Sequence, residues 1–165
     1  GYIYFAHVFS SSLFYFFAIF FAIIPEQPLI SRKIVTTSEN GVRYKAVINP
    51  ERETIVFQVD NYIIVGGNKC DRLLLTEHLT DANAWIGHFV ELKGCDIHHA
   101  LEQLEQSVQH ATFSHQTLKK KCARIVGRSF PANAGNPEFE RARNKFRQQY
   151  QCELKRLKSD QPDRI

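Results

Sequence analysis

The sequence predicts an α/β fold around one sheet, and its 165 residues are enough for a single domain. Two observations support this prediction. Apolar, β-branched runs separated by short polar turns are typical of strands, and two segments with helical spacing follow them along the chain. The resulting order of strands, helix, strand, helix and strand is expected for an α/β or α+β sandwich around one sheet.

Residues 1–25 form an apolar segment that contains no charged side chain and ends at Pro25. We expect it to be helical. A membrane-spanning helix needs roughly 20 apolar residues, which residues 2–24 provide, and Arg32 and Lys33 after it would leave the rest of the chain in the cytoplasm. The segment lacks the charged start and the cleavage site of a secretory signal. Three interpretations stay open: a membrane anchor, a segment outside the natural gene product, and a buried helix.

Strands are predicted for most of the next seventy residues. The stretch "PEQPLISRK" is typical of a linker, and "KIVTTSENGVRYKAVI" of a hairpin that turns at "ENG". We therefore assign residues 26–46 to a linker and a hairpin. The runs "TIVFQV", "YIIVGG", "CDRLLLT" and "AWIGHFVELK" then predict four further strands of the same sheet.

The periodicity changes from strand to helix at Asp96, which is a good N-cap. Apolar residues recur from there to about His110 at helical spacing: Ile97, Leu101, Leu104 and Val108. A second, basic helix begins at Pro137 in "PEFERARNKFRQQY", between the predicted strands "CARIVGRSF" and "CELKRLK", and "PANAGNP" predicts a turn before it. We assign residues 47–159 to the globular domain and residues 160–165 to a tail.

Charge is unevenly distributed along the chain, whose net charge is +4. Residues 1–115 carry 8 Lys and Arg against 12 Asp and Glu, whereas residues 116–165 carry 13 against 5. A basic C-terminal third next to an acidic middle suits a polyanionic partner, although basic runs are also typical of a solvated surface. The candidate nucleic-acid-binding residues are Lys119, Lys120, Lys121, Arg124, Arg128, Arg143 and Arg147. The four cysteines lack the spacing of a disulfide framework or a structural zinc site.

Three charged residues at strand ends indicate chemistry. Asp71 begins one predicted strand, and Glu91 and Lys93 lie on one face of another because side chains alternate along a strand. Burial of such charges is costly unless they are paired or bind a metal. If the strands are neighbours, the three side chains meet at one end of the sheet. Mg²⁺ is typically held by one or two carboxylates together with water and phosphate oxygens, and Mn²⁺ is an alternative. The sequence thus indicates a metal site for phosphodiester hydrolysis, with a solvated ion pair as the alternative.

The elements "VDNYIIVGGNKCDRLLL" and "FVELKGCDIHHALEQLEQS" resemble the PD-(D/E)xK nuclease superfamily of restriction enzymes and Holliday-junction resolvases. In particular, they are similar to a branch of small, uncharacterised bacterial proteins with "KCD" and "ELKG" elements. The resemblance continues through "ARIVGRSFP" and "FERARNKFRQQYQCELKRLKS" and covers roughly residues 47–159, with Cys70 where proline is usual. It implies a restriction-endonuclease-like fold, in which helices flank a mixed central sheet.

The resemblance also implies residue roles. Asp71 and Glu91 would hold the metal, and Lys93 would be the catalytic lysine. A glutamine on the helix after the catalytic strand completes many of these sites, and we choose Gln103 over Gln106 for this role. Weaker candidates are Asp60, which is either a further carboxylate or a turn residue, and His98 and His99, which either contact phosphate or lie on the solvated surface.

The expected function is that of a Mg²⁺-dependent endonuclease that hydrolyses phosphodiester bonds of nucleic acid, with DNA preferred over RNA. The alternative is a catalytically silent module of the same fold that binds nucleic acid or has a structural role, with or without a membrane tether. We expect residues 26–165 to be cytoplasmic. The sequence leaves open whether a homodimer forms.

Overall fold

The structure is a computed structural model that describes residues 24–81, 83–93, 96–130 and 136–165. The strands are β1 (Gln27–Glu39), β2 (Val42–Gln58), β3 (Arg72–Glu77), β4 (Trp85–Leu92), β5 (Leu118–Gly127), β6 (Cys152–Lys158) and β7 (Pro162–Arg164). The helices are α2 (Ile97–Gln109), the short 3₁₀ helix η1 (Ala111–Phe113) and α3 (Pro137–Tyr150).

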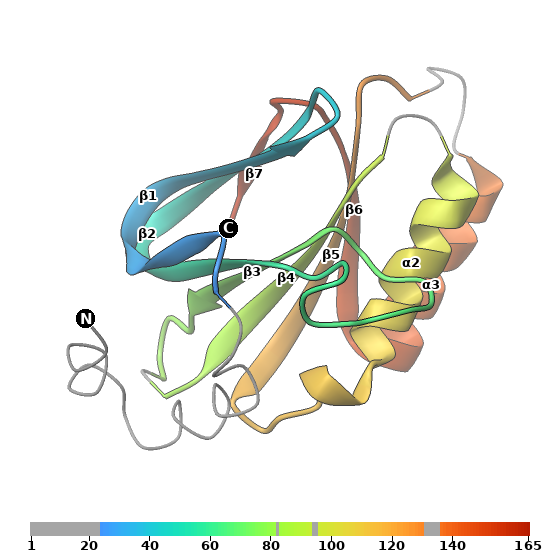
Figure 1. The fold of residues 1–165 in the computed structure, drawn as a ribbon. Coiled ribbons are helices and arrows are strands. Elements are labelled where there is room, and N and C mark those ends of the chain that lie inside the picture. The colour runs from blue at the N-terminus through green and yellow to red at the C-terminus, as the bar shows by residue number, and fades with distance from the viewer. Residues whose placement is uncertain (1–23, 82, 94–95, 131–135) are drawn as a thin grey trace.

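The strands form one mixed sheet of seven strands, in the order β1-β2-β3-β4-β5-β6, with β7 paired to β2. Neighbours from β1 to β4 are antiparallel, and β4, β5 and β6 are parallel to one another. The parallel strands need crossover connections, and α2 and α3 provide them. Both helices lie on one face of the sheet (Figure 1). The predicted α/β class with a mixed sheet is therefore confirmed, although the helices among the described residues cover only one face of the sheet.

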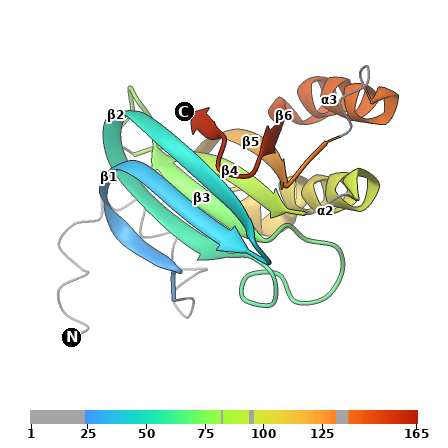
Figure 2. The same ribbon diagram turned by 90° about the horizontal axis from the view of Figure 1, so that it is seen from above.

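The opposite face of the sheet is covered by the β1–β2 hairpin and by β7. The 17-residue strand β2 is long enough to pair with β3 through its second half while its first half rises over the sheet (Figures 1 and 2). Tyr44 and Ala46 from that first half pack in one buried cluster with Val90 of β4 and Val126 of β5. Because helices cover one face and this hairpin the other, the central strands are buried on both sides.

The core on the helical face is the larger of the two. Phe89 of β4 packs there with Leu104 of α2 and Phe146 of α3, and each of these side chains is at most 1% exposed. Apolar side chains at positions i, i+3 and i+7 of α2 face the sheet. A strand that is buried on both faces has an almost continuous apolar sequence, which explains the run "WIGHFV" in β4.

Several sequence predictions are confirmed. The first hairpin turns at Asn40 and Gly41, whose φ angles of 50° and 74° are those required by a two-residue turn with both residues in the left-handed region. The side chain of Asp96 caps α2 by accepting a hydrogen bond of 3.0 Å from the amide of His99. Asn136 caps α3, directly before Pro137.

Four predictions are wrong. The run "TIVFQV" is not a separate strand but continues the second strand of the hairpin as part of β2. The presumed linker from Pro25 to Lys33 largely belongs to β1, because Pro28 is tolerated on a strand at the edge of the sheet. The presumed strand Tyr62–Gly67 is part of a loop, in which Gly66 and Gly67 have φ angles of 76° and 68°. The presumed tail contains β7, which pairs in parallel with β2.

The predicted apolar N-terminal helix falls on residues 1–23, outside the described residues, as does most of the predicted turn at "PANAGNP". In the part of the chain that the structure describes, no helix combines the length and the apolar character needed to cross a membrane.

Candidate active site

Asp71 and Glu91 face each other across two neighbouring strands. Arg72 of β3 is paired with Val90 of β4, and one step further in this antiparallel register Asp71 is opposite Glu91. The amide of Asp71 donates a hydrogen bond of 3.1 Å to the carbonyl of Val90. The amide of Leu92 donates one of 2.6 Å to the Oδ2 atom of Asp71. The two carboxylates therefore lie on the same face of the sheet, which is the face that α2 covers.

The carboxylate of Glu91 is buried without a hydrogen bond. Its side chain is 0% exposed, and neither of its oxygens has a hydrogen-bond partner. The Nζ atom of Lys93 is 3.5 Å from Glu91 Oε1, and the lysine side chain is 35% exposed. Lys93 thus lies between the buried acid and solvent.

Burial raises the pKa of both carboxyl groups. Burial, and then the charge of Asp71, raise the pKa of Glu91 to about 8, although Lys93 acts in the opposite direction. Burial also raises the pKa of Asp71, against the effect of its hydrogen bond from Leu92. The pKa of Glu91 is thus raised by its full burial and by the neighbouring, half-buried carboxylate of Asp71.

Gln103 on α2 lies next to the segment that leads into Asp71. Its Nε2 atom donates a hydrogen bond of 2.9 Å to the carbonyl of Lys69, and its Oε1 atom is buried without a hydrogen-bond partner. Gln106, by contrast, is exposed. The choice of Gln103 over Gln106 thus agrees with the position of the two side chains.

Ser107 is a site-supporting residue that sequence reasoning missed. Its hydroxyl accepts a hydrogen bond of 2.8 Å from the amide of Cys70 and donates one of 2.9 Å to the carbonyl of Gln103. It therefore fastens α2 to the residue immediately before Asp71. A serine on the buried face of a predicted helix is the only signal in the sequence that could have indicated this role.

The weaker candidates have structural partners. Asp60 forms an ion pair of 3.1 Å with Lys69. His98 of α2 joins the two helices through a contact of 2.5 Å with Glu138 of α3 and lies 3.4 Å from Glu102 of its own helix. The hydrogen bond to Glu138 raises the pKa of this histidine. His99 also lies near Glu102. Within the described ranges, no three His, Cys, Asp or Glu side chains are grouped to hold a metal, so the candidate metal site rests on two carboxylates.

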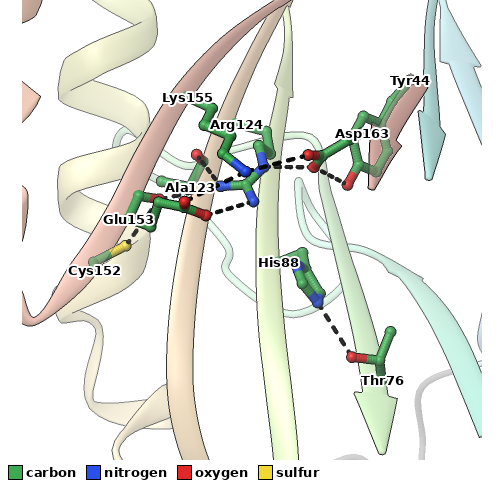
Figure 3. Close-up of polar contacts among 9 residues, drawn as sticks. All are labelled: Tyr44, Thr76, His88, Ala123, Arg124, Cys152, Glu153, Lys155 and Asp163. Atoms are coloured by element: carbon green, nitrogen blue, oxygen red, sulfur yellow. Dashed lines mark hydrogen bonds and ion pairs between the residues drawn. The ribbon is translucent and has the colours of Figure 1, made fainter. Parts of the chain in front are cut away.

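Arg124 does not belong to the predicted nucleic-acid-binding surface. Its side chain is 1% exposed and lies beneath the hairpin, where it forms an ion pair of 2.5 Å with Asp163 of β7 and one of 2.9 Å with Glu153 (Figure 3). The hydroxyl of Tyr44 donates a further hydrogen bond of 2.9 Å to Asp163. Arg124 thus fixes β7 and the hairpin to the sheet, and this buried arginine cannot contact a phosphate.

His88 occupies the same face of the sheet as this ion pair (Figure 3). Its Nε2 atom is 3.2 Å from the hydroxyl oxygen of Thr76. Burial, and then the charge of Arg124, lower its pKa well below the usual value. His88 is therefore a neutral histidine on the face of the sheet that the hairpin covers, and the two acids lie on the other face.

Two other predicted basic residues also have structural roles. Lys121 donates a hydrogen bond of 2.7 Å to the carbonyl of Val108 at the end of α2. Arg128 donates one of 2.6 Å to the carbonyl of Asn40 in the hairpin turn. Lys119 is exposed at the start of β5 and remains a candidate contact.

The structure brings the remaining predicted basic residues together. A groove of about 580 Å³ runs between α3 and the start of β6, which is an edge strand of the sheet. Its charged lining residues are Lys120, Arg143, Arg147, Lys155 and a single acid, Glu153. Glu91 is paired with Ile125 of β5, whereas the groove begins near Lys121, about 13 Å back along the same strand. The groove thus begins toward the other end of the parallel strands and lies along β6, two strands away from Glu91, with Lys155 as its lining residue nearest to the level of the acids.

No protein-family model matches the chain, and neither the curated proteins nor the solved structures contain a significant match to it.

Proposed function

We propose that the protein is a metal-dependent nuclease that hydrolyses phosphodiester bonds of nucleic acid, with Asp71, Glu91 and Lys93 as its catalytic group. The observation that carries this proposal is the pair of opposed carboxylates, one of which is fully buried with both oxygens free of hydrogen bonds. A buried acid whose only charged partner is a partly exposed lysine 3.5 Å away is costly, and a bound cation would lower that cost. The sheet order and the crossover helix after β4 support the restriction-endonuclease-like fold that the sequence resemblance implies.

The two acids fit a divalent cation such as Mg²⁺ or Mn²⁺. Oxygen ligands are those that hard cations prefer, and Mg²⁺ needs few protein ligands because water and substrate phosphate complete its shell. Asp71 keeps Oδ1 available because its hydrogen bond from Leu92 uses Oδ2. When bound, the cation would polarise the phosphoryl group and lower the pKa of a coordinated water.

The other residues would orient the reactants. Lys93 is close enough to Glu91 to balance its charge and exposed enough to reach a phosphate oxygen, where a cation stabilises the negative charge that develops during hydrolysis. The free Oε1 of Gln103 is an acceptor that can position a water. Ser107 supports this arrangement because it holds α2 to Cys70, the residue before Asp71.

The substrate class follows from charge. DNA is the preferred substrate and RNA the second, since the basic C-terminal third suits a polyanion. The position of the basic groove far from the two acids favours one alternative, a module of the same fold that binds nucleic acid without cutting it. The nuclease would cleave nucleic acid, whereas the binding module would only bind it.

A cleavage assay separates them. The full chain is incubated with plasmid, single-stranded DNA, synthetic junction DNA and RNA, in Mg²⁺ or Mn²⁺ and in EDTA. We expect metal-dependent cleavage that Lys93→Ala abolishes, whereas Lys33→Ala, an exposed lysine on β1, leaves it intact. Binding without cleavage would establish the silent module, and cleavage that survives both EDTA and Lys93→Ala would contradict the proposed site.

A further inference from the structure

The loop between β2 and β3 presents two exposed apolar side chains beside the candidate site. Tyr62 is 58% exposed and Val65 is 83% exposed. Ile64, which lies between them, is buried in the main core and anchors the loop. Exposure of a large aromatic ring at a particular place on a loop is a feature that a ligand can use.

The base of this loop is hydrogen-bonded to the backbone of Asp71. The amide of Val59 donates a hydrogen bond of 2.9 Å to the carbonyl of Asp71, and the amide of Tyr62 donates one of 3.4 Å to the carbonyl of Val59. The other end of the loop is held by the bond from Gln103 to the carbonyl of Lys69. Figure 1 shows the loop running alongside α2. Tyr62 is thus two hydrogen bonds away from Asp71.

The tip of the loop is open and uncharged. Residues 61–68 contain no Lys, Arg, Asp or Glu, so the tip has no charged side chain to attract a phosphate. A Cβ atom at Gly66 or Gly67 would have nothing within 4 Å, which leaves the backbone accessible to a ligand. An apolar, aromatic tip next to a site for phosphodiester hydrolysis suits the nucleobase that neighbours the phosphate.

A nucleobase can meet this tip only if it is not stacked within a duplex. Aromatic side chains bind single-stranded nucleic acid by stacking on bases, and every base offers a flat face. We propose that Tyr62, supported by Val65, stacks on an unpaired base beside the scissile phosphate, so that the substrate is single-stranded or locally unpaired nucleic acid. This inference rests on the proposed nuclease function and specifies its substrate class.

Binding to a fluorescent probe tests the proposal. The full chain carrying Lys93→Ala, which prevents turnover, is titrated in Mg²⁺ into a single-stranded oligonucleotide that contains 2-aminopurine, and separately into its duplex. We expect quenching in the single strand, because stacking on Tyr62 quenches this base analogue. Tyr62→Ala should remove the quenching and weaken single-strand binding roughly 5- to 150-fold, with little effect on the duplex.

Two matched variants control the experiment. Tyr62→Phe keeps the ring and should bind as tightly as the parent. Leu79→Ala changes a side chain of similar exposure, 59%, in the loop at the far end of β3, and should have no effect. Thermal unfolding of each variant should match the parent, since both positions are exposed.

Failure of the inference is distinguishable from failure of the proposed function. If the unmodified protein cleaves nucleic acid but Tyr62→Ala leaves KM and single-strand binding unchanged, the stacking role is wrong and the nuclease stands. The stacking role is also wrong if Tyr62→Phe is as defective as Tyr62→Ala, or if duplex binding falls equally. If the unmodified protein neither binds nor cleaves any nucleic acid, both are overturned.

Discussion

The amide of Leu92 donates a hydrogen bond of 2.6 Å to the Oδ2 atom of Asp71. This bond links the first residue before β3 to the residue that follows Glu91, so it fixes the two acids relative to each other. It requires only an acceptor at position 71. An asparagine can therefore keep the local structure while it removes the negative charge.

The first prediction concerns the two acids. Asp71→Asn and Glu91→Gln should each lower the cleavage rate more than 100-fold. Residues that only orient a metal ligand typically cost 10- to 100-fold. The reason is that each substitution removes the negative charge of a ligand but keeps the shape of the side chain. Initial cleavage rates measure the loss, and thermal unfolding with and without Mn²⁺ measures metal binding. A Glu91→Gln protein that Mn²⁺ stabilises as much as the unmodified protein would show that Glu91 is not a ligand.

The second prediction is a pH dependence of stability. The pKa of Glu91 is raised from 4.5 to about 8 in the folded chain. Because the pKa is raised on folding, the contribution of Glu91 to the free energy of unfolding is complete below about pH 4.5. It is lost as the pH rises through about 8. The metal-free protein should therefore lose stability over this range, at most about 1.4 kcal/mol per pH unit for one proton.

The measurement compares the unmodified protein with Glu91→Gln, whose side chain stays neutral, by urea unfolding between pH 6.5 and pH 8.5. This range avoids the effect of His88, whose lowered pKa destabilises the fold only as the pH falls below about 6.5. The variant should have the smaller slope, and Mn²⁺ should stabilise the unmodified protein more at pH 8 than at pH 6.5. Equal slopes would contradict the raised pKa of Glu91.

The third prediction concerns the buried ion pair. Arg124→Met leaves Asp163 buried without its main partner, and loss of one member of a buried pair typically costs about 3–5 kcal/mol. The free energy of unfolding should fall by about this amount in urea titrations. Lys119→Met, at an exposed position of the same strand, should change it by no more than about 0.5 kcal/mol. A change for Arg124→Met as small as that for Lys119→Met would mean that this ion pair does not fix β7.

The fourth prediction concerns the basic groove. Phosphate contacts make binding depend on salt, and removal of one contact lowers the slope of log K against log salt by about 1. If long nucleic acid also occupies the groove, Lys120→Ala combined with Arg147→Ala should lower that slope by about 2. The rate constant for cleavage should stay unchanged, because the groove is distant from the acids. An unchanged slope would exclude the groove as a phosphate site, and Arg43→Ala, at an exposed position of β2, provides the control.

The candidate site was largely predictable because its signals are local. Period-two alternation places Glu91 and Lys93 on one face, and an apolar run that opens with Asp71 indicates a neighbouring strand. The structure confirms that these strands are neighbours. The N-cap Asp96 and the start of the second helix at Pro137 likewise depend only on neighbouring residues.

The errors arose where distant contacts decide the structure. "YIIVGG" has the composition of a strand, yet only Ile64 is buried, and the positive φ angles at Asn61, Gly66 and Gly67 turn the chain away from the sheet. Arg124 looked like a surface cation because its partner Asp163 lies 39 residues away in a segment that resembled a tail. Nothing local in a sequence shows that a charge is buried.

The hydrogen bond between Val59 and Asp71 closes the β2–β3 loop at its base. Exchanges at the tip of this loop leave that backbone bond in place. The side chains at the tip can therefore be altered while the two carboxylates keep their relative arrangement.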